Sequence, residues 1–406
     1  MRIVLLVCAT LVAIAAQVQA AEVQVNVRAS DVQGNAAVAA NATGGSVIVW
    51  SSYFTSPGRS NDVLARRLDS QGSFLGDEFQ VNLTTQGNQT EPAVGMDRRG
   101  RFAVVWHGPG PEAEDIFLRL FQPTGDASTN ELLVNAGTSG RQLYPSVAVG
   151  GVGTLVVAWE SRVTTGGSER AAVCAQQFDP NGLRLGGAIV ADTSTYDGRY
   201  PDVAMDGTGR FALVWMRDRS NHPIVVRLFD ADGVARTDPF EVNTASISSV
   251  TRPAIAMNSL GYFVVAWDGH PTRASEDDIY IRTYDPNGQP QGEPFVVNTI
   301  RAGVQQWPRV GMNEANEFVV VWEHDTGEPN ATEVAARYFD PNGVPAGAQF
   351  QLNTYTLDKQ RYPDVAMAAD GSYLAAWESD SQDGSDYGIF ASLEPCLLAT
   401  DPNRQD

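Results

Sequence analysis

The chain of 406 residues contains few lysines, few cysteines and few long apolar runs. Lys359 is its single lysine, and arginine supplies the other strongly basic side chains. Because 48 acidic residues stand against 28 basic ones, the formal net charge is −20. A chain this acidic repels the phosphates of nucleic acids and the headgroups of anionic membranes. We therefore expect neither nucleic acid nor a membrane surface among its partners.

One apolar run stands out, and it lies at the N-terminus. Arg2 precedes the apolar segment 3–16, and the small residues Val18 and Ala20 then suit a cleavage site. The run is too short for a transmembrane helix and has the layout of a secretory signal. Residues 1–20 are accordingly predicted to be a signal peptide, and the mature chain is predicted to be secreted or periplasmic, without membrane insertion.

The three cysteines give little room for disulfide bonds. Cys8 belongs to the predicted signal, which leaves Cys174 and Cys396. An oxidising compartment would allow these two to pair. The repeats described below place them in different structural units, whereas a disulfide requires Cα atoms within about 7 Å of each other. The sequence therefore leaves this bridge open and disfavours it.

The tryptophans reveal an internal repeat. The segment RYPDVAM occurs at residues 199–205 and again at 361–367. Seven of the eight tryptophans end an apolar run, at intervals of 52 to 56 residues: Trp50, Trp106, Trp159, Trp215, Trp267, Trp322 and Trp377. Fourteen residues before each stands a proline, with Ala36 as the one exception, and ten residues earlier an asparagine, with Ala191 as the exception. The duplicated heptapeptide surrounds this proline in units four and seven.

Each unit contains four short runs of β-type residues and no helical periodicity. Glycine, or Asn316 in unit six, stands six residues before each of these tryptophans, as a hairpin turn with positive φ requires. Four antiparallel strands in each of seven units indicate an all-β, seven-bladed β-propeller. The predicted blades cover approximately residues 36–82, 92–135, 145–191, 201–243, 253–298, 308–353 and 363–393.

The seventh unit lacks a fourth run of its own. Residues 23–27, VQVNV, match the pattern of the fourth strands, so we predict that this N-terminal segment completes the last blade. Such closure removes an exposed sheet edge. The mature propeller is then one domain of residues 21–395, followed by a tail of residues 396–406, and we expect a monomer.

The segments VNT, PDVAM, FVVVW and FDPNG resemble the repeats of secreted bacterial seven-bladed propellers. The resemblance covers residues 23–393 and concerns the fold alone. It implies no particular activity, because such repeats serve in binding and adhesive modules as well as in enzymes.

The residues next to the repeat prolines are candidates for a binding site. These residues lie where the chain enters the innermost strand of each blade, at the face that carries the long loops. We call this face the upper face. Four of the seven residues before the prolines, or before Ala36 in unit one, are aromatic. Aromatic faces cover the C–H surface of a sugar, while guanidinium and amide groups bind hydroxyls or a carboxylate. We predict a ligand site formed by Tyr144, Arg199, Tyr200, Arg252, Trp307, Arg361 and Tyr362. The alternative is structural: the aromatics pack between blades, and the neighbouring glutamines bond the backbone.

Histidines and acidic loops raise the question of a metal. All four histidines, His107, His222, His270 and His324, fall in the loops that follow the repeat tryptophans, but in different blades. Asp380, Asp383 and Asp386 in unit seven, and Glu276, Asp277 and Asp278 in unit five, offer the oxygen ligands that Ca²⁺ prefers. Their spacing lacks the alternate-residue pattern of a calcium loop, so solvated acidic loops are the default interpretation and no cofactor is expected.

Three functional hypotheses follow. Because the sequence contains no familiar catalytic motif and assigns no catalytic residue, the leading one is a secreted, non-catalytic binding or adhesion propeller for an extracellular glycan. The alternative is a propeller enzyme, a lyase or hydrolase of acidic polysaccharide, in which a histidine and a tyrosine serve as base and acid and Arg199 or Arg361 holds a carboxylate. The third is a scaffold for a protein partner, bound through the variable acidic loops.

Overall fold

The computed structural model describes residues 21–53, 60–137, 139–192, 194–220, 222–243, 248–249, 252–270, 276–328 and 331–396. The predicted signal peptide lies outside these residues, as does the predicted tail apart from Cys396. Nowhere in these ranges is there a helix with the length and apolarity to cross a bilayer.

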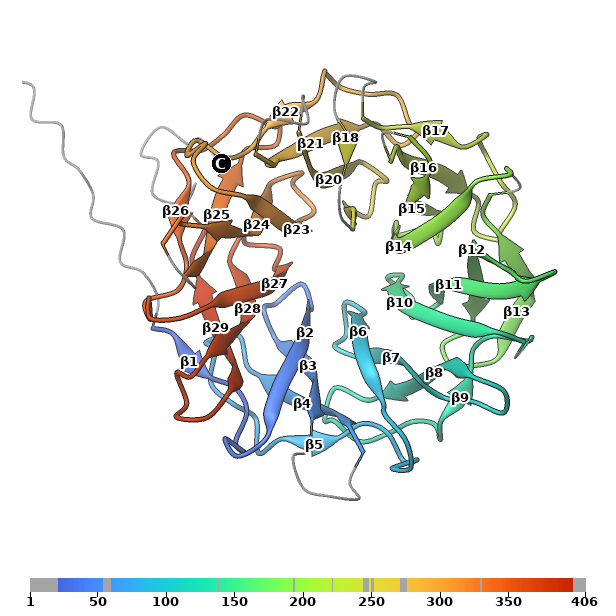
Figure 1. Cartoon of the computed structure of the whole chain (residues 1–406), viewed down its shortest axis with the longest axis horizontal. Coiled ribbons are helices and arrows are strands. Elements are labelled where there is room, and N and C mark those ends of the chain that lie inside the picture. Colours follow the sequence, from blue (N-terminus) through green and yellow to red (C-terminus); the bar gives the residue numbers. More distant parts are fainter. Residues whose placement is uncertain are drawn as a thin grey trace, which may run out of the picture.

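The strands form seven sheets arranged radially about one axis, which confirms the predicted propeller (Figure 1). Blade 1 contains β2 (Val32–Ala40), β3 (Ser46–Tyr53), β4 (Asp62–Leu68) and β5 (Phe79–Gln80). Blade 2 contains β6 (Thr90–Met96), β7 (Phe102–Pro109), β8 (Glu114–Phe121) and β9 (Leu132–Leu133). Blade 3 contains β10 (Arg141–Val149), β11 (Leu155–Thr165), β12 (Ser168–Phe178) and β13 (Arg184–Val190). Blade 4 contains β14 (Asp197–Met205), β15 (Phe211–Asp218), β16 (Ile224–Phe229) and β17 (Phe240–Glu241).

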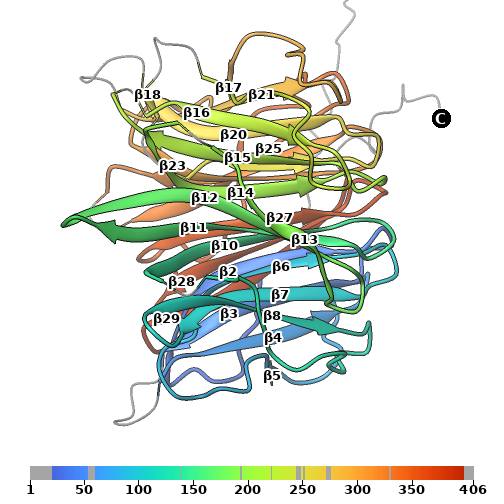
Figure 2. The same ribbon diagram turned by 90° about the vertical axis from the view of Figure 1, so that its right-hand side faces the viewer.

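The innermost position of blade 5 is shared by two short strands. This blade contains β18 (Ser248–Ser249), β19 (Ala254–Met257), β20 (Phe263–His270), β21 (Asp278–Tyr284) and β22 (Phe295–Val296). Blade 6 contains β23 (Gln305–Met312), β24 (Phe318–Asp325), β25 (Thr332–Phe339) and β26 (Phe350–Gln351). Blade 7 contains β27 (Gln360–Met367), β28 (Tyr373–Asp380), β29 (Tyr387–Glu394) and the N-terminal β1 (Val23–Gln24). Seen from the side, the strands run between two faces and the connecting loops gather at their ends (Figure 2).

The ring closes as predicted, within blade 7. β1 pairs antiparallel with β29, with Val23 opposite Ala391 and Gln24 opposite Phe390. The amide of Val25 continues the ladder by donating to the carbonyl of Ile389 at 2.8 Å. The first and last parts of the propeller therefore share one sheet, and the outer edge of β29 is covered.

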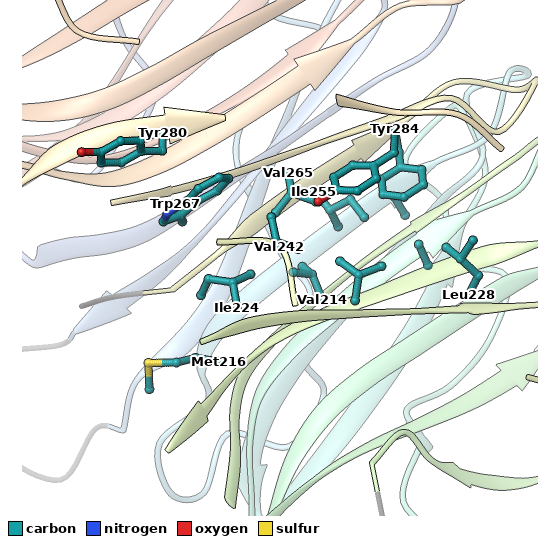
Figure 3. Close-up of a cluster of buried hydrophobic side chains, with 14 residues drawn as sticks. Val214, Met216, Ile224, Leu228, Val242, Ile255, Val265, Trp267, Tyr280 and Tyr284 are labelled. Atoms are coloured by element: carbon teal, nitrogen blue, oxygen red, sulfur yellow. The ribbon is translucent and has the colours of Figure 1, made fainter. Parts of the chain in front are cut away.

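The core consists of separate clusters between neighbouring blades. Figure 3 shows one of them, where Trp267 and Val265 of β20 pack with Val214 of β15 and Ile224 of β16. Six of the repeat tryptophans are 0% exposed and Trp159 is 3% exposed. Burying one such large side chain contributes about 1.5–3 kcal/mol. The repeat methionines also pack against these clusters, as the sequence predicts: Met96, Met205, Met257, Met312 and Met367.

The repeat asparagines extend the ladder between the third and fourth strands. In blade 2 the Asn135 Oδ1 accepts the amide of Ile116 at 2.8 Å, and its Nδ2 donates to the Asp115 carboxylate at 2.7 Å. Asn26, Asn82, Asn243, Asn298 and Asn353 accept the corresponding amide in the other blades. This explains the strict position of asparagine in the repeat, since an unpaired buried amide costs about 1–3 kcal/mol. Cys174 and Cys396 are both free thiols.

Candidate functional site

The residue before the repeat proline, or before Ala36 in blade 1, adopts the left-handed backbone conformation in six blades. The φ angles are 56° at Asn35, 50° at Glu91, 53° at Tyr144, 51° at Tyr200, 55° at Trp307 and 49° at Tyr362. In each case the register of the innermost strand shifts at this point, as in a β-bulge. Such φ values cost a non-glycine residue about 1–3 kcal/mol and cluster at functional sites. The bulges place these residues around the upper mouth of the axial channel.

Three of these bulges are each held by a glutamate of the preceding blade. Glu378 Oε1 accepts the amide of Asn35 at 2.6 Å, and Glu160 Oε2 accepts that of Tyr200 at 3.1 Å. Glu323 Oε2 accepts the amide of Tyr362 at 3.4 Å. All three carboxylates are buried. Each one links a blade to the next at the height of the channel mouth.

The sequence-based prediction missed these glutamates. Each follows a repeat tryptophan directly, so the recurrence of Trp-Glu at residues 159–160, 322–323 and 377–378 was the available signal. In unit one Ser51 has this position, and its Oγ accepts the amide of Glu91 at 3.2 Å.

The buried glutamates Glu378 and Glu323 differ in the group that donates to their carboxylates: an arginine for Glu378 and a glutamine for Glu323. Burial raises the pKa of Glu378 to about 7, although Arg361 Nε lies 3.0 Å from its Oε2. Burial also raises the pKa of Glu323, which accepts a hydrogen bond from Gln306 rather than from an arginine. A carboxylate in a site of low polarity favours its neutral form unless opposite charge or donors compensate for the lost solvation.

The bulged residues surround a cavity of about 420 Å³ at the upper channel mouth. Five of the seven predicted ligand-binding residues line it: Tyr144, Tyr200, Arg252, Trp307 and Tyr362. Its wall also contains four charged side chains that the prediction did not select, namely Glu91, Asp202, Arg309 and Asp364. The aromatic residues and the arginine come from blades 3 to 7, so one blade alone could not form this site.

Arg252 lies among aromatic rings. Its guanidinium carbon is 4.5 Å from the ring centre of Tyr144, 5.0 Å from that of Tyr200 and 5.4 Å from that of Trp307. One terminal nitrogen is 3.6 Å from Glu91 Oε1. The buried Nε of Arg252 and the buried Oε2 of Glu91 have no hydrogen-bond partner among the described residues. Burial raises the pKa of Glu91, and the positive charge of Arg252 acts in the opposite direction.

The structure does not bring Arg199 and Arg361 to the cavity wall. Arg199 pairs with Glu160 at 3.4 Å and with Asp218 at 3.0 Å. Arg361 pairs with Glu378 and lies 3.7 Å from the ring centre of Tyr387. Both arginines therefore form ion pairs with glutamates that hold the bulges of the rim.

The glutamines near the rim are structural. In five blades the Oε1 of a glutamine accepts the indole N–H of the repeat tryptophan, at 2.8 to 3.2 Å: Gln33, Gln89, Gln142, Gln305 and Gln360. Their side-chain oxygens are therefore engaged in the core and do not point to a ligand.

The histidines do not converge. His107 Nε2 lies 2.6 Å from Thr90 Oγ1, and burial lowers the pKa of this histidine to about 4. His270 lies 2.6 Å from Asp277, and His324 lies 2.9 Å from Gln305. His222 lies 3.8 Å from Asp218 in blade 4.

The acidic loops make internal contacts. Asp383 accepts a hydrogen bond from Asn26 Nδ2 at 3.1 Å, and Asp278 accepts one from Asn298 at 2.6 Å. Within the part of the chain that the structure describes, no three His, Cys, Asp or Glu side chains are grouped so that they could hold a metal ion.

Comparison with known proteins shows the fold and no family. No family model matches the chain, and no curated protein matches it. Among solved structures, an ulvan lyase bound to -[GlcA(1-4)Rha3S]- is similar with a TM-score of 0.57 and 11% identity, over 93% of this chain and 97% of that one. The polysaccharide lyase Uly1 is similar with a TM-score of 0.53 and 9% identity, over 87% and 88%.

A third similar structure has a different chemistry. It is a fungal alcohol oxidase in complex with copper, with a TM-score of 0.54 and 13% identity, over 93% of this chain and 76% of that one. Propellers of this shape therefore carry unrelated reactions, and function has to be argued from the site.

Proposed function

We propose that this propeller binds an acidic polysaccharide at the upper channel mouth and cleaves it. The observation that carries the proposal is Arg252, a cation held among three aromatic rings with one buried N–H unused. A guanidinium can bind the two oxygens of a carboxylate or a sulfate in parallel. The surrounding rings offer flat apolar surface to the C–H face of the same sugar.

The cavity suits a lyase better than a hydrolase. A glycoside hydrolase uses two carboxyl groups, one of them free to act as acid. Asp202 already accepts the amide of Ile255 at 3.0 Å, and Asp364 accepts that of Val38 at 2.8 Å. Both therefore support the contacts between blades, and Glu91, the third acid of the cavity, is paired with Arg252 at 3.6 Å. An elimination requires instead a cation at the sugar carboxylate, a base for the adjacent proton and an acid for the leaving oxygen.

The central cavity and a second cavity beside it together offer a candidate for each of these roles. Arg252 would hold the carboxylate, in place of Arg199 or Arg361. Burial raises the pKa of Tyr144 and of Tyr362, which keeps both phenols protonated and suits them to donate to the leaving oxygen. His107, neutral because of its lowered pKa, lines a second cavity that shares Glu91 with the first, and is the candidate base.

Cleavage is favoured over binding alone because two of the similar structures are polysaccharide lyases. The test uses the mature protein with alginate, polygalacturonate, ulvan and hyaluronan, and with dextran as the neutral control. Calorimetry measures binding, and the ultraviolet absorbance of the unsaturated sugar product measures elimination. We expect binding to an acidic polymer and none to dextran. Equal affinity for dextran, or no binding to any acidic polymer, would contradict the proposal.

The second candidate is a non-catalytic glycan-binding propeller. It is favoured by the hydrogen bond between His107 and Thr90, which occupies one nitrogen of the candidate base, while the other nitrogen is buried. Binding to an acidic polymer without any unsaturated product would select this candidate.

A further inference from the structure

A second cavity, of about 610 Å³, opens between blades 1 and 2. Its lining includes Tyr53, Asn61, Asn88, Thr90 and His107. Two contacts join it to the central cavity. Glu91 lines both, and the Tyr53 hydroxyl, on the second cavity, donates to Asn35 Oδ1, on the first, at 2.5 Å. This second cavity, here called the side cavity, therefore lies directly beside the central one, with Glu91 in the wall that they share.

The charge of the side cavity differs from that of the central one. Glu91, Glu112 and Glu114 line it, Glu114 as the ion-pair partner of Arg141 at 3.0 Å, and no lysine or arginine is among the described residues that line it. The central cavity contains Arg252 and Arg309. A carboxylate or sulfate in the side cavity would therefore meet like charge, which costs several kcal/mol when the charges are close.

The side cavity is nevertheless suited to a sugar. Asn61, Asn88 and Thr90 supply amide and hydroxyl groups, carboxylates accept sugar hydroxyl protons, and Pro109 adds an apolar surface.

We propose that the side cavity is a second subsite, which binds an uncharged sugar unit beside the acidic unit held by Arg252. The preferred polymer then alternates acidic and neutral units. This inference rests on the proposed function, because it takes the binding of an acidic unit at Arg252 as given.

The experiment compares two oligosaccharides of equal length by calorimetry. A hyaluronan tetrasaccharide alternates acidic and neutral units, and a tetragalacturonate carries a carboxylate on every unit. We expect the wild type to bind the alternating oligomer at least about tenfold more tightly, because tetragalacturonate places a carboxylate against Glu112 and Glu114. Free glucuronate, which fills the central cavity alone, serves as the reference ligand.

The variant Glu112→Gln/Glu114→Gln tests the cause of the preference. Both positions lie on a surface loop or at its junction with β8, so the fold is expected to survive. Removing the two charges should strengthen the binding of tetragalacturonate. The hyaluronan tetrasaccharide should then bind at most about threefold more tightly than tetragalacturonate, and the affinity for glucuronate should not change. Glu328→Gln, an exposed residue in the corresponding loop of blade 6, is the matched control and should change nothing.

The outcomes separate the two proposals. If glucuronate and both oligomers fail to bind, the proposed function is wrong and the subsite is wrong with it. If glucuronate binds but the wild type does not distinguish the two oligomers, the central site stands and the side cavity is not a subsite. If the double variant still prefers the alternating oligomer as strongly as the wild type does, the side cavity is not the second subsite either.

Discussion

The two ends of the axial channel are formed by the same repeats but differ in construction. At the upper mouth, six residues adopt left-handed φ angles and surround a cavity with an arginine among aromatic rings. At the lower mouth, the short hairpin turns of five blades follow one pattern, in which an Asp or Asn oxygen accepts two backbone amides, as Asp97 does from Arg99 and Arg101. The lower cavity is smaller, about 190 Å³, and Arg98 of blade 2 forms an ion pair across it with Glu314 of blade 6.

The comparison teaches where the repeat is constrained. The lower turns satisfy their own backbone groups, so each blade can form its turn alone. Three of the six upper bulges are held by a carboxylate from the preceding blade and a fourth by Ser51 Oγ, so these parts of the rim form only in the assembled ring. We therefore expect changes at the upper mouth to alter ligand binding and changes at the lower mouth to leave it intact.

The largest effect is expected from Arg252→Ala. Loss of the guanidinium removes the charge that would hold the acidic sugar, and binding of acidic oligosaccharides should weaken about 100-fold, as for a truncated arginine hot spot. Calorimetry measures the loss. Arg98→Ala at the lower mouth is the control for removing an arginine and should leave affinity unchanged. If the two variants bind acidic oligosaccharides with equal affinity, the upper mouth is not the binding site and the two mouths do not differ in function.

The next effect concerns the bond between glutamine and tryptophan. Gln142→Leu should lower the free energy of unfolding by about 1–3 kcal/mol, because it leaves the buried indole N–H of Trp159 without an acceptor. Urea unfolding measures the change. Blade 4 provides a natural comparison, since Gly198 occupies the glutamine position and the Trp215 N–H already lacks a partner among the described residues. An unchanged unfolding midpoint in Gln142→Leu would contradict this role.

Glu378 predicts a pH dependence of stability. Its pKa is raised from 4.5 to about 7 in the folded state, so the folded protein retains a proton that the unfolded chain releases. This contribution is fully present below pH 4.5 and is lost as pH rises through about 7. Between pH 5 and pH 7.5 the unfolding free energy of the wild type should therefore fall by about 2 kcal/mol more than that of Glu378→Gln.

The glutamine variant is chosen because its side-chain oxygen can still accept the Asn35 amide. Urea unfolding at the two pH values gives the difference between variant and wild type, in which the contributions of other carboxylates cancel. A difference that does not vary with pH would show that Glu378 titrates normally.

The smallest effect is expected at the lower mouth. Arg98 and Glu314 are 52% and 41% exposed, and exposed ion pairs contribute about 0–1 kcal/mol. Arg98→Ala/Glu314→Ala should therefore change the free energy of unfolding by less than about 1 kcal/mol, as measured in urea. A larger loss would mean that the lower mouth also depends on contacts between distant blades.

The fold could be predicted from the sequence because its signals are local and repeated. Trp50 and its six counterparts, with the prolines and asparagines at fixed distances, each report the same position in a blade. The closure by β1 was also predictable, since VQVNV matches the fourth strands and the last unit lacks one. Repetition supplies six or seven observations of each feature, which a unique domain does not provide.

The lining of the central cavity was predicted in part, while its role in ligand binding stays a prediction. The positions before the prolines identified Tyr144, Tyr200, Arg252, Trp307 and Tyr362 as rim residues, and all five line the cavity. The fate of Arg199 and Arg361 could not be predicted, because it depends on carboxylates of other strands and blades. The side cavity depends on the three-dimensional approach of the loops of blades 1 and 2, for which the repeat contains no signal.

The sheet shared by the two ends of the propeller has a consequence for protein engineering. Because Val23 lies opposite Ala391, residues 22 and 396 can be joined by a short glycine-rich linker without crossing the ring. New ends could then be opened at a lower hairpin turn, such as the one between β14 and β15. The resulting circular permutant would keep every blade and the rim, while the place where the chain starts would move to the opposite side of the molecule.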